Sequence, residues 1–195
     1  ESAYMETIEI LRYTVEAKDA YTKGHSDRVA EYSCLIGKQL GLSESELKTL
    51  RIGGLFHDIG KIGIPDSILL KDSRLSNDEY SEIKNHPSIG AHILSNATIF
   101  NDIIPIVKHH HERFDGYPNK LKGNIIPYLA RITSVADAFD AMTSKRSYRD
   151  SLPIDVVKKE FLNNSGTQFD PEIVKVFLEI LDTKFSEIDR IRSSK

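Results

Sequence analysis

The sequence predicts an all-α protein, and three observations carry that prediction. Apolar residues recur every three or four positions along most of the chain, a spacing that places them on one side of a helix. Stretches that alternate between polar and apolar residues, which would indicate strands, are scarce. Helix-capping sequences stand ahead of several apolar runs. With 195 residues and a hydrophobic share of 39%, the chain has enough apolar residues for one sizeable core.

The predicted helices follow in order along the chain. A first helix is expected over residues 4–20, where Tyr4, Ile8, Leu11 and Val15 share one side.

A second helix is expected from about residue 25 to residue 40. It ends at Gly41, because glycine readily takes the left-handed conformation that closes a helix. The clearest loop covers residues 114–124, which are rich in Asp, Gly, Pro and Asn. Three further helix starts are predicted by capping sequences: Ser43 with Glu46, Ser76 with Glu79, and Asp170 with Pro171 and Glu172.

The domain organisation expected from this pattern is simple. Residues 1–20 form a leading helix, and residues 21–195 form one helical domain. Because the chain starts without an initiator methionine and goes directly into helical pattern, we expect it to be part of a longer protein. The leading helix would then connect the domain to an upstream sensor region.

Composition narrows the class of protein. A formal net charge of −3 gives no indication of duplex nucleic-acid binding, which usually needs a basic surplus. No apolar run approaches the ~18 to 20 residues that cross a bilayer. Cys34 is the single cysteine, so no internal disulfide can form and a reducing compartment is expected. The predicted location is the cytoplasm, including the cytoplasmic portion of a larger sensor protein.

His57 and Asp58 form the first candidate for chemistry. They follow the apolar run of residues 52–56 and precede a glycine-rich segment that allows Lys61 to fold back over them. An adjacent imidazole and carboxylate offer a nitrogen ligand and an oxygen ligand able to bridge, which suits manganese, iron or zinc. Alone, such a pair is weak evidence for a metal.

Three consecutive histidines, residues 109–111, strengthen the metal hypothesis. Helical neighbours point about 100° apart, so all three cannot converge on one point, but two can do so where a helix ends. A solvated surface patch is the alternative interpretation. Asp137 adds to the case because it interrupts the apolar stretch of residues 132–139, where an unpaired carboxylate would be costly.

Taken in order, these stretches resemble the HD-GYP phosphodiesterases, a branch of the HD-domain metal hydrolases that degrade cyclic di-GMP. The resemblance covers about residues 18–150, and seven ordered matches are far more specific than any single one. The matching segments are residues 21–26 (YTKGHS), 56–61 (FHDIGK), 86–87 (HP), 110–113 (HHER), 115–118 (DGYP), 135–137 (VAD) with 140–141 (DA), and 146–149 (RSYR).

The resemblance implies an HD-domain helical bundle with a buried binuclear metal site. Its cofactors would be two divalent ions, iron or manganese. The implied ligands are His25, His57 and Asp137 for one ion, His86, His110 and His111 for the other, and Asp58 as the bridge between them. From the residues alone, His25 could merely stand at a helix start, and His86 before Pro87 could mark a helix stop. His92 and His109 match no ligand of the family, and we expect surface or supporting positions for both.

The resemblance also implies roles around the metals. Asp58 and Lys61 are the predicted catalytic residues, with Lys61 placed to contact a phosphate oxygen or the nucleophile. Glu112 would accept a hydrogen bond from a ligand imidazole. Two divalent ions outweigh the two carboxylates, so a phosphodiester anion is attracted. The predicted substrate-binding residues are Lys61, Tyr117, Arg146 and Arg149.

Two departures from the family pattern bear on function. The loop runs from Asp115-Gly116 directly into Tyr117-Pro118, two residues shorter than usual, which puts in doubt the fit of the substrate and the docking of a diguanylate cyclase. Family members that bind a third ion use a glutamate one turn before the first histidine. Tyr21 occupies that position, and a neutral phenol is a poor ligand, so we expect two ions.

The function that the resemblance implies is metal-dependent hydrolysis of cyclic di-GMP to linear pGpG in second-messenger signalling, and further cleavage to GMP stays open. Two alternatives stay open. One is a phosphohydrolase for another nucleotide such as cyclic GMP-AMP. The other is a receptor or docking module without enzymatic activity. The sequence also leaves open whether the chain forms a homodimer.

Overall fold

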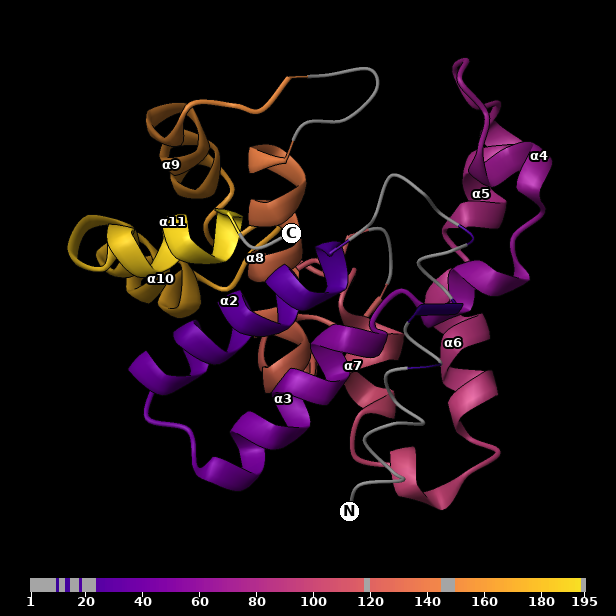
Figure 1. Cartoon of the computed structure of the whole chain (residues 1–195), viewed down its shortest axis with the longest axis horizontal. Helices are drawn as coiled ribbons and strands as arrows, with labels where there is room; N and C mark the ends of the chain where they lie inside the picture. Colours follow the sequence, from indigo (N-terminus) through magenta and orange to yellow (C-terminus); the bar gives the residue numbers. More distant parts are fainter. Residues whose placement is uncertain are drawn as a thin grey trace.

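The computed structural model describes residues 10, 13–14, 18, 24–117, 120–144 and 150–193. These residues form helices and connecting turns without a strand, and one isolated bridge pairs Ser165 with Phe169 (Figure 1). The all-α prediction is therefore confirmed. None of the helices within these ranges has both the length and the apolar character that a membrane span requires.

The elements succeed one another along the chain with short connections. The α-helices are α2 (His25–Gln39), α3 (Glu44–Phe56), α4 (Asp66–Leu69), α5 (Asn77–Ile83), α6 (His86–Leu94), α7 (Ile104–His109), α8 (Tyr128–Thr143), α9 (Ile154–Asn163), α10 (Pro171–Thr183) and α11 (Phe185–Ser193). The 3₁₀ helices are η2 (Ile59–Gly63), η3 (Thr98–Phe100) and η4 (Gly123–Ile125).

Two hydrophobic clusters hold the helices together. The larger packs α2 and α8 against the C-terminal helices α9, α10 and α11, with Phe139, Phe161 and Phe177 in edge contact at its centre. The smaller joins the end of α3 to η2, α6 and α7 through residues such as Phe56 and Phe100. The elements that carry the candidate ligands come from both clusters, so the packing of the two clusters fixes the positions of those ligands.

The predicted helix ends are confirmed where capping chemistry specifies them. Helix α2 ends at Gln39, and Gly41 follows with a φ of 77°, the left-handed conformation expected of it. Ser43 and Ser76 each form the predicted capping box with the glutamate three residues later. Asp170 caps α10 by accepting a hydrogen bond from the backbone of Glu172.

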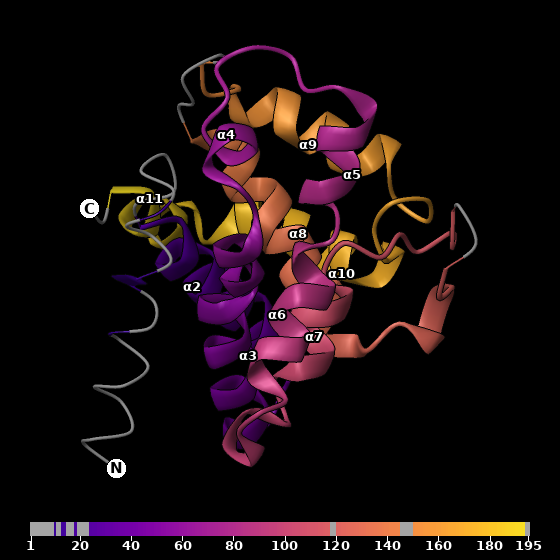
Figure 2. The ribbon, with the colours of Figure 1, turned by 90° about the vertical axis from the view of Figure 1, so that its right-hand side faces the viewer.

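The loop of residues 114–124 is confirmed as a loop across its described part, with its last residues in η4. It extends away from the helices at the right of Figure 2. The backbone amides of Phe114 and Asp115 donate to the carbonyls of Gln168 and Thr167, at 3.1 and 2.8 Å. The base of the loop is thus fixed to the turn between α9 and α10.

The leading helix predicted over residues 4–20 lies largely outside the described residues, as does Tyr21. Lys18 is described: its Nζ donates to the carbonyls of Ile62 and Ile64, each at 2.7 Å, and lies 3.4 Å from the carboxylate of Asp66. This lysine therefore contacts the turn that follows η2.

Candidate metal centre

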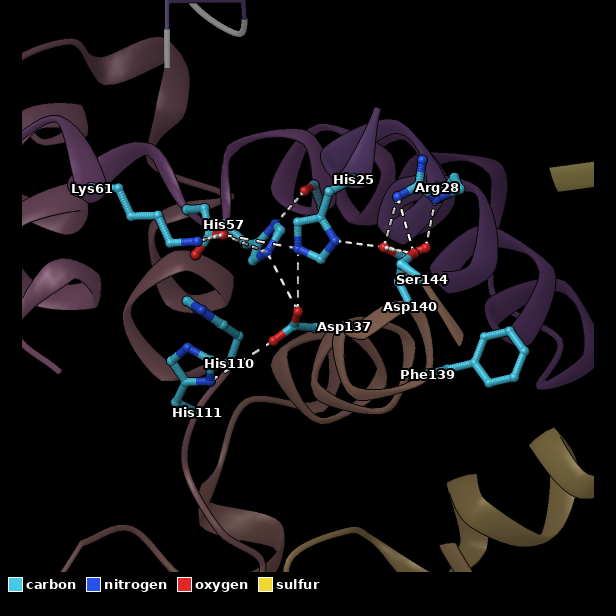
Figure 3. Close-up of polar contacts among 12 residues, drawn as sticks. His25, Arg28, His57, Lys61, His110, His111, Asp137, Phe139, Asp140 and Ser144 are labelled. Carbon is cyan, nitrogen blue, oxygen red and sulfur yellow. Dashed lines mark hydrogen bonds and ion pairs between the residues drawn. The ribbon is translucent and has the colours of Figure 1, made fainter. Parts of the chain in front are cut away.

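The candidate ligands come from five helices whose ends or middles meet at one place. At a helix end the backbone changes direction, so adjacent side chains such as His57 and Asp58 can face one centre instead of diverging. Figure 3 shows most of this set. His25 is the first residue of α2, His57 and Asp58 follow α3, His86 is the first residue of α6, His110 and His111 follow α7, and Asp137 lies inside α8.

Asp58 stands between two groups of histidines. Its Oδ1 lies 3.1 Å from Nε2 of His86. Its Oδ2 lies 3.4 Å from Nε2 of His57 and 3.9 Å from Nε2 of His25. The potential ligand atoms of Asp58 with His86, His110 and His111, and those of Asp58 with His25 and His57, each fall within 4.8 Å of one another. One carboxylate therefore faces two different sets of imidazoles.

Asp137 lies beside the same centre. Its Oδ1 is 3.3 Å from Nε2 of His25 and 3.9 Å from Nε2 of His57, and its Oδ2 is 3.9 Å from Nδ1 of His111. It also groups with His57 and His110 within ligand distance. The side chain thus lies near His25 and His57, as predicted, and extends toward the other histidines as well.

Backbone carbonyls fix the rings of three histidines. Nδ1 of His57, His86 and His110 lies 2.7 to 2.8 Å from the carbonyl three residues earlier in each case. A carbonyl only accepts hydrogen bonds, so Nδ1 carries the proton and Nε2 presents a lone pair.

The Nε2 atoms carry no proton and lie close to one another, and this arrangement tests whether a metal fits the site. Nε2 of His86 and Nε2 of His110 lie 3.4 Å apart, and Nε2 of His57 is buried without a hydrogen-bond partner among the described residues. A cation at the centre would satisfy them. Imidazole nitrogens combined with carboxylate oxygens suit a first-row divalent metal, so the residues fit such an ion.

The pKa shifts of most candidate ligands favour the protonation state that binds a cation. Burial lowers the pKa of His57, and it holds the pKa of His110 well below its usual range. Burial alone would raise the pKa of Asp58, but Lys61 and the neighbouring imidazoles hold it well below its usual range. Asp137 behaves in the same way, with its pKa lowered chiefly by the hydrogen bond from His25. These groups are in their metal-binding protonation states at neutral pH.

His25 differs because two carboxylates flank it. Burial acts against its positive charge, but hydrogen bonds and charges from Asp137 and Asp140 outweigh burial and raise the pKa of His25 to about 9. A metal that binds its Nε2 would have to displace that proton.

Lys61 lies over the centre. It stands on η2, and its Nζ is 2.6 Å from Oδ2 of Asp58. The side chain of His111, which is 48% exposed, marks the open side of the centre. His92 is exposed on α6 and His109 is partly buried at the end of α7, as expected for residues outside the ligand set.

Some sequence expectations are not met by the geometry. Glu112 lies 3.7 Å from Nδ1 of His109 and 3.9 Å from Nζ of Lys120, and among the described residues no contact joins it to a candidate ligand. The histidine that lies nearest to it, His109, is outside the proposed ligand set. The alternative that His86 marks a helix stop is wrong, since His86 and Pro87 begin α6.

The structure describes only some of the predicted substrate-binding residues. Tyr117 is 70% exposed on the projecting loop. Arg146 and Arg149 lie outside the described residues, as does Pro118.

Sequence reasoning missed a group of residues behind His25. Nδ1 of His25 lies 2.7 Å from Oδ2 of Asp140, which also binds Arg28 and Ser144 (Figure 3). A signal was available: Asp140 follows Asp137 by three residues on a helix, so both lie on the same face.

This geometry defines a helical domain with a buried histidine–aspartate centre able to hold metal, and comparison with known proteins gives the family. The model of the HD domain matches residues 9–173, so the chain belongs to the HD domain family. It is 40% identical over 184 residues to a cyclic di-GMP phosphodiesterase of Thermotoga maritima, covering 92% of this chain and 50% of that protein. The resemblance to the HD-GYP phosphodiesterases is thereby confirmed.

Other relatives have names that refer to a second cyclic dinucleotide, cyclic GMP-AMP. The chain is 38% identical over 176 residues to the 3'3'-cGAMP-specific phosphodiesterase 2 of Vibrio cholerae, covering 88% of this chain and 34% of that protein. A solved cyclic GMP-AMP phosphodiesterase of V. cholerae shares the fold, with a TM-score of 0.65 and 21% identity over 94% of this chain and 53% of that one. The chain spans half or less of the length of these two curated relatives.

Proposed function

We propose that this domain hydrolyses a phosphodiester bond of cyclic di-GMP, giving linear pGpG, with divalent metal bound at the centre. The observation that carries the proposal is the position of Asp58, whose two oxygens face two separate sets of imidazoles. The proposal also draws on relatives that are named cyclic di-GMP phosphodiesterases.

The cofactor we propose is a pair of iron or manganese ions. The fit rests on the unpaired Nε2 atoms described above. The proposed ligands are His25, His57 and Asp137 for one ion and His86, His110 and His111 for the other, with Asp58 shared. When bound, two such ions would lower the pKa of the attacking water and neutralise charge developing on phosphorus.

The chain's own residues would position the substrate. Lys61 places a positive charge 2.6 Å from Asp58, at the edge where a phosphate would enter, and its ammonium can pair with a nonbridging phosphate oxygen. The half-exposed His111 marks the same open side. We propose that Tyr117 lines the pocket against a base and that Arg146 and Arg149 grip the guanine or the second phosphate, because the guanidinium fork pairs with two acceptors at once.

A second substrate, cyclic GMP-AMP, has an observation in its favour. Relatives of similar identity are named 3'3'-cGAMP-specific phosphodiesterases. The loop that carries Tyr117 is two residues shorter than the family pattern, so its contact with a base is expected to change. This loop projects from the domain and is also where we propose that a diguanylate cyclase docks (Figure 2). The substrate class agrees with a cytoplasmic domain linked to an upstream sensor region.

Product analysis tests the proposal. The purified protein, loaded anaerobically with Fe²⁺ or Mn²⁺, would be incubated with cyclic di-GMP, cyclic GMP-AMP and cyclic di-AMP, and products separated by chromatography. We expect the parent protein to convert cyclic di-GMP to the linear dinucleotide and to lose this activity when a chelator is added. The Asp58→Asn variant should give no product. Asp170→Asn, remote from the centre, serves as the control and should keep activity. A metal-loaded protein that cleaves none of the three would contradict the proposal.

A further inference from the structure

The N-terminal end of α2 and the C-terminal half of α8 interlock through two pairs of side chains. His25 and Arg28 are three residues apart on α2, and Asp137 and Asp140 are three residues apart on α8, so each pair shares one helix face. His25 lies between the two aspartates, with Nε2 3.3 Å from Asp137 and Nδ1 2.7 Å from Asp140 (Figure 3). Its two nitrogens therefore face opposite ways.

Asp140 is held on the side away from the metal centre. The residue is 1% exposed, and both of its oxygens have partners. Its Oδ1 accepts from Nε of Arg28 at 2.6 Å, and its Oδ2 accepts from the other arm of Arg28 at 3.0 Å and from Oγ of Ser144 at 3.1 Å. A forked guanidinium contact of this kind fixes a carboxylate in orientation as well as position.

The support of His25 differs in kind from that of the other rings. His57, His86 and His110 each donate from Nδ1 to a carbonyl of their own chain segment. For His25 the partner of Nδ1 is instead a side chain from another helix, Asp140 on α8, 115 residues further along the chain. The partner of His25 is a carboxylate, which carries a negative charge. A carboxylate that accepts the hydrogen bond from Nδ1 makes Nε2 of the same ring a stronger metal ligand.

We propose that Asp140, held by Arg28, is the positioning residue for His25, keeping Nε2 directed at the metal and raising its strength as a ligand. The inference rests on the proposed metal-binding function. Neither residue touches the substrate in this account. Their contribution is to the metal affinity of the His25 side of the centre.

Metal titration of the full chain tests the proposal, with Mn²⁺ as the probe and a competing chelator as the readout. Asp140→Asn keeps the size of the side chain but removes its charge, and it should weaken Mn²⁺ binding on the His25 side of the centre about 10- to 100-fold. The chain provides a matched control in Asp170, which is also a buried aspartate paired with an arginine, Arg131, but stands at the N-terminal cap of α10. Asp170→Asn should bind Mn²⁺ within about twofold of the parent, since asparagine still caps a helix.

A spectroscopic signature separates positioning from general stability. The Nδ1 proton of His25 should give a protected, downfield NMR signal in the metal-loaded parent, prepared with diamagnetic Zn²⁺. That signal should persist in Asp170→Asn and be shifted or lost in Asp140→Asn. If Asp140→Asn does not fold, Arg28→Gln replaces it, because it leaves the bond between His25 and Asp140 in place. Its Mn²⁺ affinity should fall measurably, by about three- to tenfold.

The outcomes are distinct. Unchanged Mn²⁺ affinity in Asp140→Asn, or in Arg28→Gln where that variant stands in, would overturn the positioning role while leaving the proposed function intact. Equal weakening in Asp140→Asn and Asp170→Asn would overturn it as well, since the effect would then be general destabilisation. A parent protein that binds neither Mn²⁺ nor Fe²⁺ would instead remove the proposed function, and this inference with it.

Discussion

At the scale of single residues, the hydrogen bonds made by the Nδ1 atoms orient the imidazole rings toward the candidate metal centre. Nδ1 of His57 and of His110 is held by a carbonyl, and Nδ1 of His25 by a carboxylate. Each Nε2 is thereby turned inward before any ion arrives, so little side-chain entropy remains to be lost on binding. The histidine-rich segments predicted this centre, but the residues behind them were not predicted, because such contacts depend on how α2 packs on α8.

Removing a shared ligand should strip the metal without unfolding the domain. We expect Asp58→Ala to lose most bound metal and all activity, because its two oxygens serve both sets of histidines, and His57→Ala to lose at least the ion on its own side. Elemental analysis beside circular dichroism checks this. Full metal content in an inactive Asp58→Ala protein would show that Asp58 is not a ligand.

The raised pKa of His25 predicts a pH effect on the metal-free protein. Its pKa is about 9 when folded and about 6.5 when unfolded, so its contribution to stability is complete below pH 6.5 and lost as pH rises through 9. The loss is on the order of 3 kcal/mol, since each pH unit between the two pKa values is worth ~1.4 kcal/mol.

Thermal melts of the chelator-treated protein between pH 6.5 and 9.5 measure this effect. Metal should stabilise the protein more at the alkaline end, where no proton has to be displaced from His25. The control is His25→Gln, in which the fall in stability with pH should largely disappear. The same pH dependence in His25→Gln and in the parent would assign the effect to another group.

At the scale of elements, backbone contact brings the two histidine sets together. The 3₁₀ helix η2 lies so close to α6 that a Cβ on Gly60 would sit 1.8 Å from the carbonyl of His86 and 2.5 Å from the amide of Gly90. Glycine at this position is therefore what allows Asp58 to reach His86. The sequence indicated a flexible turn here, but the partner element could not be read from it, because the contact joins segments far apart in sequence.

Gly60→Ala should disturb both stability and metal binding. Because the obstructing atoms are backbone, α6 must move, and we expect a loss of about 1 to 3 kcal/mol in unfolding free energy and a reduced metal content. Gly63→Ala on the same 3₁₀ helix is the control, since its new methyl group would meet only the side chain of Ile89. Denaturant melts and metal analysis compare the two. A Gly60→Ala protein as stable and as metal-rich as Gly63→Ala would contradict the role given to this contact.

The elements also show how far local sequence determines structure. Capping boxes at Ser43 and Ser76 and the glycine after α2 fixed helix ends as predicted, because their hydrogen bonds are local. The short helices α4 and α6 carried no comparable local signal, and Pro87 was equally compatible with a helix stop and a helix start. Tertiary packing decides such cases.

At the scale of the whole molecule, the elements that carry the candidate metal ligands come from two hydrophobic clusters. The fold could be predicted from the sequence, and so could the gathering of histidines and aspartates at one place, because the motifs that carry them stand in a fixed order. The substrate could not, since Tyr117 stands on an exposed loop and the arginine segment lies outside the described residues.

Arg146→Ala and Arg149→Ala should weaken substrate binding while sparing metal content, because neither is a proposed ligand. Losing a charge-assisted hydrogen bond costs roughly 1.5 to 3 kcal/mol, or about ten- to hundredfold in affinity. Calorimetry with cyclic di-GMP measures the change, and the exposed Arg51 on α3 provides Arg51→Ala as a control. If both variants bind as tightly as the control, the grip on the substrate lies elsewhere.

Anomalous diffraction from metal-loaded crystals tests the central assignment most directly. We expect two peaks, one bound by each oxygen of Asp58, with His25, His57 and Asp137 around the first and His86, His110 and His111 around the second. A single peak, a third fully occupied peak within bridging distance, or peaks that avoid Asp58 would contradict the binuclear centre proposed for this domain.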